Sequence, residues 1–167
     1  MPTATREEFV DAADNIWKNH GVYLWGGNGE ATALLSFGKI ASMETSRHDA
    51  YRVMKHISEL YDAGYDMSKS IAADCSGLIV KILRDLKCIP STADYRARDL
   101  QNMCKKKSLD KLQPGDLVFN KEKTATHTGI YAGNLMVIEM QGRDRGCVKR
   151  KISEGAWVCG GSLPYIK

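Results

Sequence analysis

The sequence predicts an α+β fold in which helices come first and antiparallel strands follow. A capping box and several apolar segments with helical spacing occupy the chain up to residue 103. After Pro114-Gly115 the pattern changes to short apolar runs separated by turn residues. This order is typical of α+β domains. With 167 residues and no repeat or linker-like stretch, we expect one domain spanning residues 1–167.

The first helix is expected to begin after Thr5 and to end near His20. Thr5 and Glu8 have the spacing of a capping box, and the apolar residues that follow lie on one helical face. A glycine then stops the helix. Residues 22–25 form a short extended segment, which the glycine-rich residues 26–29 interrupt.

Residues 30–73 predict a helical insertion. We expect one helix over residues 31–40 and a second between Arg47 and Asp62, where Gly64 stops it.

The remaining elements follow Asp74. An apolar run predicts a helix over residues 75–86, and a further helix is expected over residues 92–103. Five strands, each bounded by turn residues, complete the fold: 116–119, 127–132, 135–140, 148–152 and 157–165.

The most informative motif is Asp74-Cys75-Ser76-Gly77, because it places a thiol in the first turn of a helix, where the dipole favours an anion. Farther along the chain, His127 stands at the start of an expected strand. A free thiol with a pKa of about 8.5 is mostly un-ionised at pH 7, and a helix N-terminus supplies only part of the stabilisation that a thiolate needs. An imidazolium must supply the rest, so the sequence predicts a cysteine hydrolase with Cys75 as nucleophile and His127 as base.

A third group is needed to orient the imidazole, and Glu139 is the expected one. If residues 133–135 form a three-residue hairpin loop, His127 and Glu139 become diagonal neighbours on one face of the sheet. A two-residue loop would send them to opposite faces. Gln141, directly across from His127 in the same register, is the competing candidate.

The other cysteines and histidines indicate no further chemistry. The remaining four cysteines lack Cys-x-x-Cys spacing and are expected to be small packing residues: Cys88, Cys104, Cys147 and Cys159. His20, His48 and His56 lack the spacing of a metal pair. We therefore expect neither a metal site nor a cofactor.

The formal net charge of +4 is too small to indicate a nucleic-acid partner, but it suits a protein that works beside an anionic polymer. The basic runs 105–107 and 149–151 are either solvated surface or a binding surface. No segment reaches the length of a membrane span, so we expect no membrane insertion, and we expect a monomer.

Four motifs together resemble the NlpC/P60 cysteine peptidases, papain-like hydrolases of bacterial cell-wall peptides. They occur in the order of that family: Tyr23-Leu24-Trp25-Gly26-Gly27, Asp74-Cys75-Ser76-Gly77-Leu78, Pro114-Gly115-Asp116-Leu117 and His127-Thr128-Gly129-Ile130-Tyr131 with Val137-Ile138-Glu139. The resemblance implies a nucleophile helix packed on a central antiparallel sheet. It also implies that Tyr23, Asp74 and Ser76 lie on the substrate side of the cleft.

The resemblance implies a peptidoglycan stem peptide as substrate. An endopeptidase that cuts between D-glutamyl and the diamino acid is the first expectation, and an N-acetylmuramoyl-L-alanine amidase is the alternative. A non-catalytic module for wall binding or a phage tail, or a thiol acyltransferase, would also fit the fold.

Two features depart from the family pattern. Glu139 stands where the family commonly has His, and residues 30–73 lengthen the connection before Asp74. The insertion either caps the cleft or adds helices to the scaffold.

Residues 1–8 lack the apolar core of a signal peptide. We therefore expect synthesis in the cytoplasm and action on the cell wall, either as an endolysin released at lysis or as part of a larger secreted or phage protein.

Overall fold

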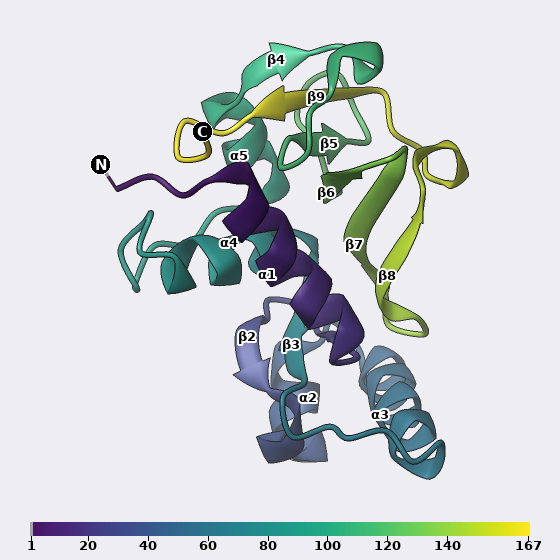
Figure 1. Ribbon diagram of the computed structural model, residues 1–167. Coiled ribbons are helices and arrows are strands. Elements are labelled where there is room, and N and C mark those ends of the chain that lie inside the picture. The colour runs from purple at the N-terminus through teal and green to yellow at the C-terminus, as the bar shows by residue number, and fades with distance from the viewer. Residues whose placement is uncertain (1) are drawn as a thin grey trace.

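The computed structural model describes residues 2–167. Its largest sheet has six strands in the order β4-β9-β5-β6-β7-β8, with every neighbouring pair antiparallel. A second sheet has three strands in the order β1-β3-β2. In Figure 1 the six-stranded sheet lies above and beside α1, and β2 and β3 of the smaller sheet lie below that helix. The expected α+β class, with helices before an antiparallel sheet, is confirmed.

The helices are α1 (Arg6–Lys18), α2 (Phe37–Met43), α3 (Arg47–Asp62), α4 (Cys75–Asp85) and α5 (Ala97–Met103). The strands are β1 (Val22–Tyr23), β2 (Asn28–Ala31), β3 (Ile71–Ala73), β4 (Lys105–Lys107), β5 (Leu117–Phe119), β6 (Thr128–Gly133), β7 (Met136–Gly142), β8 (Gly146–Lys151) and β9 (Cys159–Ser162). No helix within residues 2–167 is long and apolar enough to cross a membrane.

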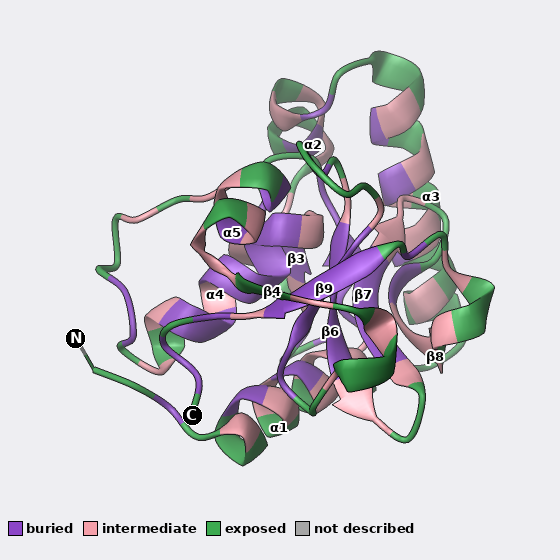
Figure 2. Ribbon diagram, turned by 90° about the horizontal axis from the view of Figure 1, so that it is seen from above, coloured by how far each residue is buried: buried purple, intermediate pink, exposed green. Residues whose placement is uncertain are grey.

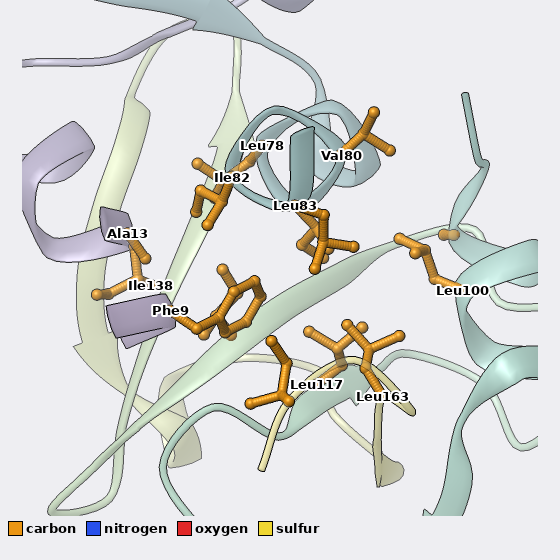
Figure 3. Close-up of a cluster of buried hydrophobic side chains, with 14 of the residues drawn as sticks. Phe9, Ala13, Leu78, Val80, Ile82, Leu83, Leu100, Leu117, Ile138 and Leu163 are labelled. Carbon is orange, nitrogen blue, oxygen red and sulfur yellow. The ribbon is translucent and has the colours of Figure 1, made fainter. Parts of the chain in front are cut away.

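The main core lies between the six-stranded sheet and the helices α1 and α4. Phe9 of α1 and Leu78, Ile82 and Leu83 of α4 converge on the sheet residues Leu117 and Ile138 (Figure 3). These side chains are at most 1% exposed. Burying each of them stabilises the fold by about 1.5–3 kcal/mol before the loss of conformational entropy is counted. The core therefore holds α4, and the Cys75 at its start, firmly against the sheet.

A separate, smaller core supports the insertion. Apolar residues of α2 and α3 pack against β1 and β3, with Ile40, Val53 and Ile57 at the centre. Figure 2 shows buried residues along the strands and the inner helix faces, while the outer turns of α2, α3 and α5 are exposed. The insertion thus has its own apolar support and lies at the β1 side of the molecule.

The β6–β7 hairpin has the expected register but not the expected loop length. The loop has two residues, Asn134 and Leu135, both with positive φ, instead of the expected three. A bulge between Tyr131 and Gly133 adds the missing residue, so that Tyr131 still pairs with Val137. The bulge therefore keeps His127 and Glu139 on one face, which a two-residue loop alone would not do.

Three of the predicted helices agree with the structure, and the predicted ranges of two others do not. The helices after Thr5, between Arg47 and Asp62 and from Cys75 agree with α1, α3 and α4. The helix predicted over residues 31–40 is wrong, because the end of β2 and a 3₁₀ turn occupy its first half and α2 begins only at Phe37.

The second incorrect helix is the one predicted over residues 92–103. Residues 92–96 contain no helix, and α5 begins only at Ala97, where Asp99 accepts the backbone N–H of Arg96 at 2.9 Å. The strands β2, β3 and β4 are missing from the sequence prediction, because β2 and β4 lack an apolar run and β3 has only three residues. Similarly, the strand expected over residues 157–165 is limited to β9.

Candidate active site

Cys75 is the first residue of α4, and Asp74 caps that helix. The Asp74 carboxylate accepts backbone N–H groups from Gly77 at 2.7 Å and from Gly26 at 3.0 Å. A Cβ atom on Gly77 would lie 1.9 Å from the carbonyl oxygen of Gly27. Residue 77 must be glycine, because α4 begins in direct contact with the glycine turn after β1.

His127 directly precedes β6 and faces Cys75 across the gap between sheet and helix. The two side chains line the same cleft and interact electrostatically, and the Cys75 Sγ lies 3.9 Å from the carbonyl oxygen of Thr126, the residue just before His127. The Nε2 of His127 lies 3.1 Å from Oε1 of Glu139. Because a carboxylate only accepts, Nε2 carries a proton and Nδ1 is left for the thiol.

Glu139 is fully buried in β7 and contacts two cationic groups. Its carboxylate accepts the Nε2–H of His127 and two N–H groups of Arg150, at 3.2 and 3.3 Å. Burial by itself would raise the pKa of Glu139, but the hydrogen bonds from His127 and Arg150 lower it. Glu139 is therefore ionised at neutral pH, even though it has no contact with water.

The electrostatics of this cluster favour a charged imidazole. Burial alone would lower the pKa of His127, but hydrogen bonds to Cys75 and Glu139, and the negative charges of both, raise it to about 9. The ring of Trp157 stacks on the His127 ring, with a centroid distance of 5.3 Å and an angle of 12° between the planes. The site can therefore hold a protonated imidazole next to a thiol, as thiol acyl transfer requires.

The sequence reasoning missed Arg150 and Trp157. Arg150 was part of a basic run read as solvated or ligand-binding surface, whereas its guanidinium group reaches Glu139 and the carbonyl oxygen of Glu154 at 2.7 Å. The pairing of Glu139 with Val148 places Arg150 on the same face of the sheet. A register for the β7–β8 hairpin would have been the signal, but a bulge between Met140 and Gly142 obscures it.

One lysine of each basic run also makes a structural contact. Lys149 pairs with Asp14 of α1 at 2.6 Å, and Lys107 pairs with the buried Asp116 at 2.7 Å. Asp116 also pairs with Arg6, so the Pro-Gly-Asp segment ties α1 to the sheet.

Cys75 and His127 open onto a cleft of about 580 Å³. All three residues expected on the substrate side, Tyr23, Asp74 and Ser76, line this cleft. Burial and the nearby charges of Cys75 and Asp74 raise the pKa of Tyr23, so its phenol keeps its proton and can donate a hydrogen bond into the cleft. The substrate-binding roles of these residues stay predictions.

Gln141, the competitor of Glu139, also lines the cleft, but it makes no contact that would orient His127. Its buried Oε1 has no hydrogen-bond partner within the chain from residue 2 onward. Of the two candidates, Glu139 is therefore the one that the structure places on the imidazole.

The insertion forms part of one wall of the cleft. Glu44, just after α2, accepts the backbone N–H of Trp25 at 2.9 Å and Nε of Arg143 at 2.7 Å. Arg143 and Trp25 line the cleft, as does Arg52 of α3. Tyr65 is exposed and lies outside the lining. The insertion thus does not cover Cys75 but braces the wall next to it.

Among residues 2–167, no group of three or more His, Cys, Asp or Glu side chains is arranged to hold a metal ion. The polar cluster at the cleft is instead a thiol, an imidazole and a carboxylate in sequence.

A thiol at a helix N-terminus facing a histidine on an antiparallel sheet is the arrangement of papain-like thiol hydrolases. The NlpC/P60 family model matches residues 20–159, which is most of the chain, so the protein belongs to the NlpC/P60 family. No curated protein matches the sequence.

Solved structures agree on the fold. The NlpC/p60 domain of the peptidoglycan hydrolase SagA matches with a TM-score of 0.60 at 16% identity, covering 96% of this chain and 100% of that one. The P60 domain of an antigen from M. avium subspecies paratuberculosis matches with a TM-score of 0.58 at 15% identity, over 96% and 97% of the two chains. RipD from Mycobacterium tuberculosis, a non-catalytic peptidoglycan-binding NlpC/p60 domain protein, matches with a TM-score of 0.56 at 13% identity, over 93% and 97%.

Proposed function

We propose that this protein is a cysteine hydrolase that cleaves an amide bond in a peptidoglycan stem peptide. The observation that carries the proposal is that Cys75 and His127 meet at one open cleft, where His127 is hydrogen-bonded to the buried Glu139. Membership in the NlpC/P60 family supports the choice of a cell-wall peptide as substrate.

The reaction follows from this geometry. The Cys75 thiolate attacks the amide carbonyl carbon, and the oxyanion receives the backbone N–H of Cys75 at the start of α4. His127 then donates its proton to the departing amine, leaving a thioester on Cys75. A water molecule gives its proton to the neutral His127 and attacks the thioester, which releases the carboxylate product and restores the pair. Glu139 keeps the imidazole oriented and stabilises its charged form in both steps.

The bond that we propose is the one between D-glutamyl and the diamino acid. The alternative is an amidase that cuts between the sugar lactyl group and L-alanine. Mass spectrometry of digested muropeptides separates them, because the first leaves a new diamino-acid N-terminus and the second frees the intact stem peptide from the glycan.

The test uses purified cell walls with the wild type and the variants Cys75→Ala and His127→Ala. We expect both variants to lose at least about 1000-fold in rate. Cys104→Ala is the matched control, since Cys104 is another partly buried free thiol and does not line the cleft. Full activity in Cys75→Ala or His127→Ala would refute the proposed mechanism.

A non-catalytic wall-binding module is the competing function, because RipD shares this fold. Reaction with iodoacetamide at pH 7 distinguishes the two. A thiolate paired with an imidazolium is alkylated much faster than a free thiol. An inert Cys75 would favour the binding module.

A further inference from the structure

We propose that Arg96 and Arg98 form a subsite for a free carboxylate next to the scissile amide, so that the enzyme selects carboxylate over carboxamide forms of its peptide. This inference rests on the proposed function and adds a specificity to it. It comes from the unequal pairing of the charged side chains that line the cleft.

Four arginines line the cleft, and two of them are already neutralised. Arg143 bonds to the buried Glu44 at 2.7 Å and lies 3.8 Å from Asp49. Arg52 makes two hydrogen bonds to Asp144, at 2.7 and 3.0 Å, and a third to Asp49 at 3.1 Å. The wall on the insertion side therefore has three carboxylates for two guanidinium groups and no free positive charge.

The two arginines at the start of α5 are different. Within residues 2–167, the Arg96 side chain has neither an ion pair nor a hydrogen bond to a side chain, and it is exposed. Arg98 has only a 4.0 Å approach to Asp99, with both side chains more than 40% exposed. Such a contact contributes little, so both guanidinium groups keep their charge and their donors free.

Asp74, the one carboxylate of the lining, forms no ion pair with either arginine among the described residues. Both oxygens of Asp74 accept backbone N–H groups, those of Gly77 and Gly26. In Figure 1, α5 and the α2–α3 pair lie at opposite ends of the molecule, and within residues 2–167 no ion pair joins Arg96 or Arg98 to a carboxylate of the insertion. The cleft is therefore charge-balanced and aromatic at one wall and positive at the other.

A carboxylate is the ligand that this positive wall favours. Guanidinium groups bind carboxylates through paired N–H donors, and the interaction is charge-assisted. A carboxamide of nearly the same shape offers one neutral acceptor and presents its own N–H groups to the arginines. A stem peptide with a free D-glutamyl α-carboxyl group should thus bind better than its amidated form.

The experiment measures binding apart from turnover. Two synthetic stem peptides that differ only in a free or amidated D-glutamyl α-carboxyl group are titrated calorimetrically into the Cys75→Ala protein. We expect the carboxylate peptide to bind about tenfold more tightly at low salt, and the ratio to shrink in about 0.5 M salt. In the Arg96→Gln/Arg98→Gln double variant, the two peptides should bind within about twofold of each other.

Arg145→Gln serves as the matched control, because Arg145 is exposed and does not line the cleft, and it should keep the full preference. The subsite would be overturned if the two peptides bind the Cys75→Ala protein equally, or if neither binds it. It would also be overturned if the preference for the carboxylate survives in the Arg96→Gln/Arg98→Gln double variant. Failure of the proposed function looks different: the wild type would cleave neither peptide, while the Cys75→Ala protein would still prefer the carboxylate.

Discussion

The Nε2 of His127 lies 3.1 Å from Oε1 of Glu139, and a bulge in the β6–β7 hairpin makes this contact possible. With the same two-residue turn but no bulge, His127 and Glu139 would face opposite sides of the sheet. The group that contacts the imidazole is thus an ionised carboxylate that is also paired with Arg150.

Replacing Glu139 tests what the carboxylate does for the imidazole. We predict that Glu139→Gln lowers kcat/KM about 100-fold and that Glu139→Ala lowers it about 1000-fold, because glutamine can still orient the ring but cannot stabilise its charge. Wild-type-like rates in both variants would move the orienting role to another residue.

The pH dependence of kcat/KM also tests the effect of Glu139 on His127. The pKa of His127 is raised to about 9, so the thiolate–imidazolium pair should persist up to that pH and activity should fall above it. Without the Glu139 charge, the histidine loses its proton at a lower pH. We therefore predict that the alkaline limb of the kcat/KM profile moves to lower pH in Glu139→Gln, and an unchanged limb would contradict this.

We predict that Arg150→Met moves the alkaline limb of the kcat/KM profile to higher pH. Removal of the guanidinium leaves His127 as the only cation at Glu139, which strengthens the attraction between them and favours the imidazolium. We also predict a loss of about 1–3 kcal/mol in the free energy of unfolding, because a buried carboxylate loses two hydrogen bonds. Lys151→Met is the control, since Lys151 is exposed and does not contact Glu139, and it should change neither the limb nor the stability.

Local signals in the sequence predicted the parts of the site that depend on one segment. The capping residue Asp74 and the apolar run after Cys75 were enough to define α4. The hairpin around residue 134 brings Glu139 to His127 as expected, but through a two-residue loop and a bulge instead of the expected three-residue loop. Arg150 could not be found in this way, because its contact depends on the register of a second hairpin that contains another bulge. The brace from Glu44 to Arg143 joins residues 99 positions apart, and no local pattern reports such a pair.

Gly77 is the residue through which α4 contacts the glycine turn. A Cβ atom there would overlap the carbonyl oxygen of Gly27, which belongs to the backbone and cannot rotate away. We predict that Gly77→Ala costs about 3 kcal/mol or more in the free energy of unfolding, measured by urea denaturation, and displaces Cys75 enough to abolish activity. Gly38→Ala in α2 is the matched control, because the space there is open, and it should stabilise the protein by about 0.5–1 kcal/mol.

Glu44 tests whether the insertion acts on the cleft or only on the scaffold. Its buried carboxylate holds both the Trp25 backbone and Arg143, so Glu44→Gln removes the charge that neutralises Arg143 next to Cys75. We predict a loss of about 2–3 kcal/mol in stability, and a several-fold change in KM at temperatures where the variant is still folded, because Arg143 and Trp25 are then free to shift. Glu59→Gln provides the comparison: its carboxylate is 56% exposed in a pair with Lys55, and neither residue lines the cleft, so it should cost at most about 1 kcal/mol and leave KM unchanged. If Glu44→Gln lowers stability but leaves KM equal to that of the wild type, the insertion is a scaffold element and does not shape the wall that meets the substrate.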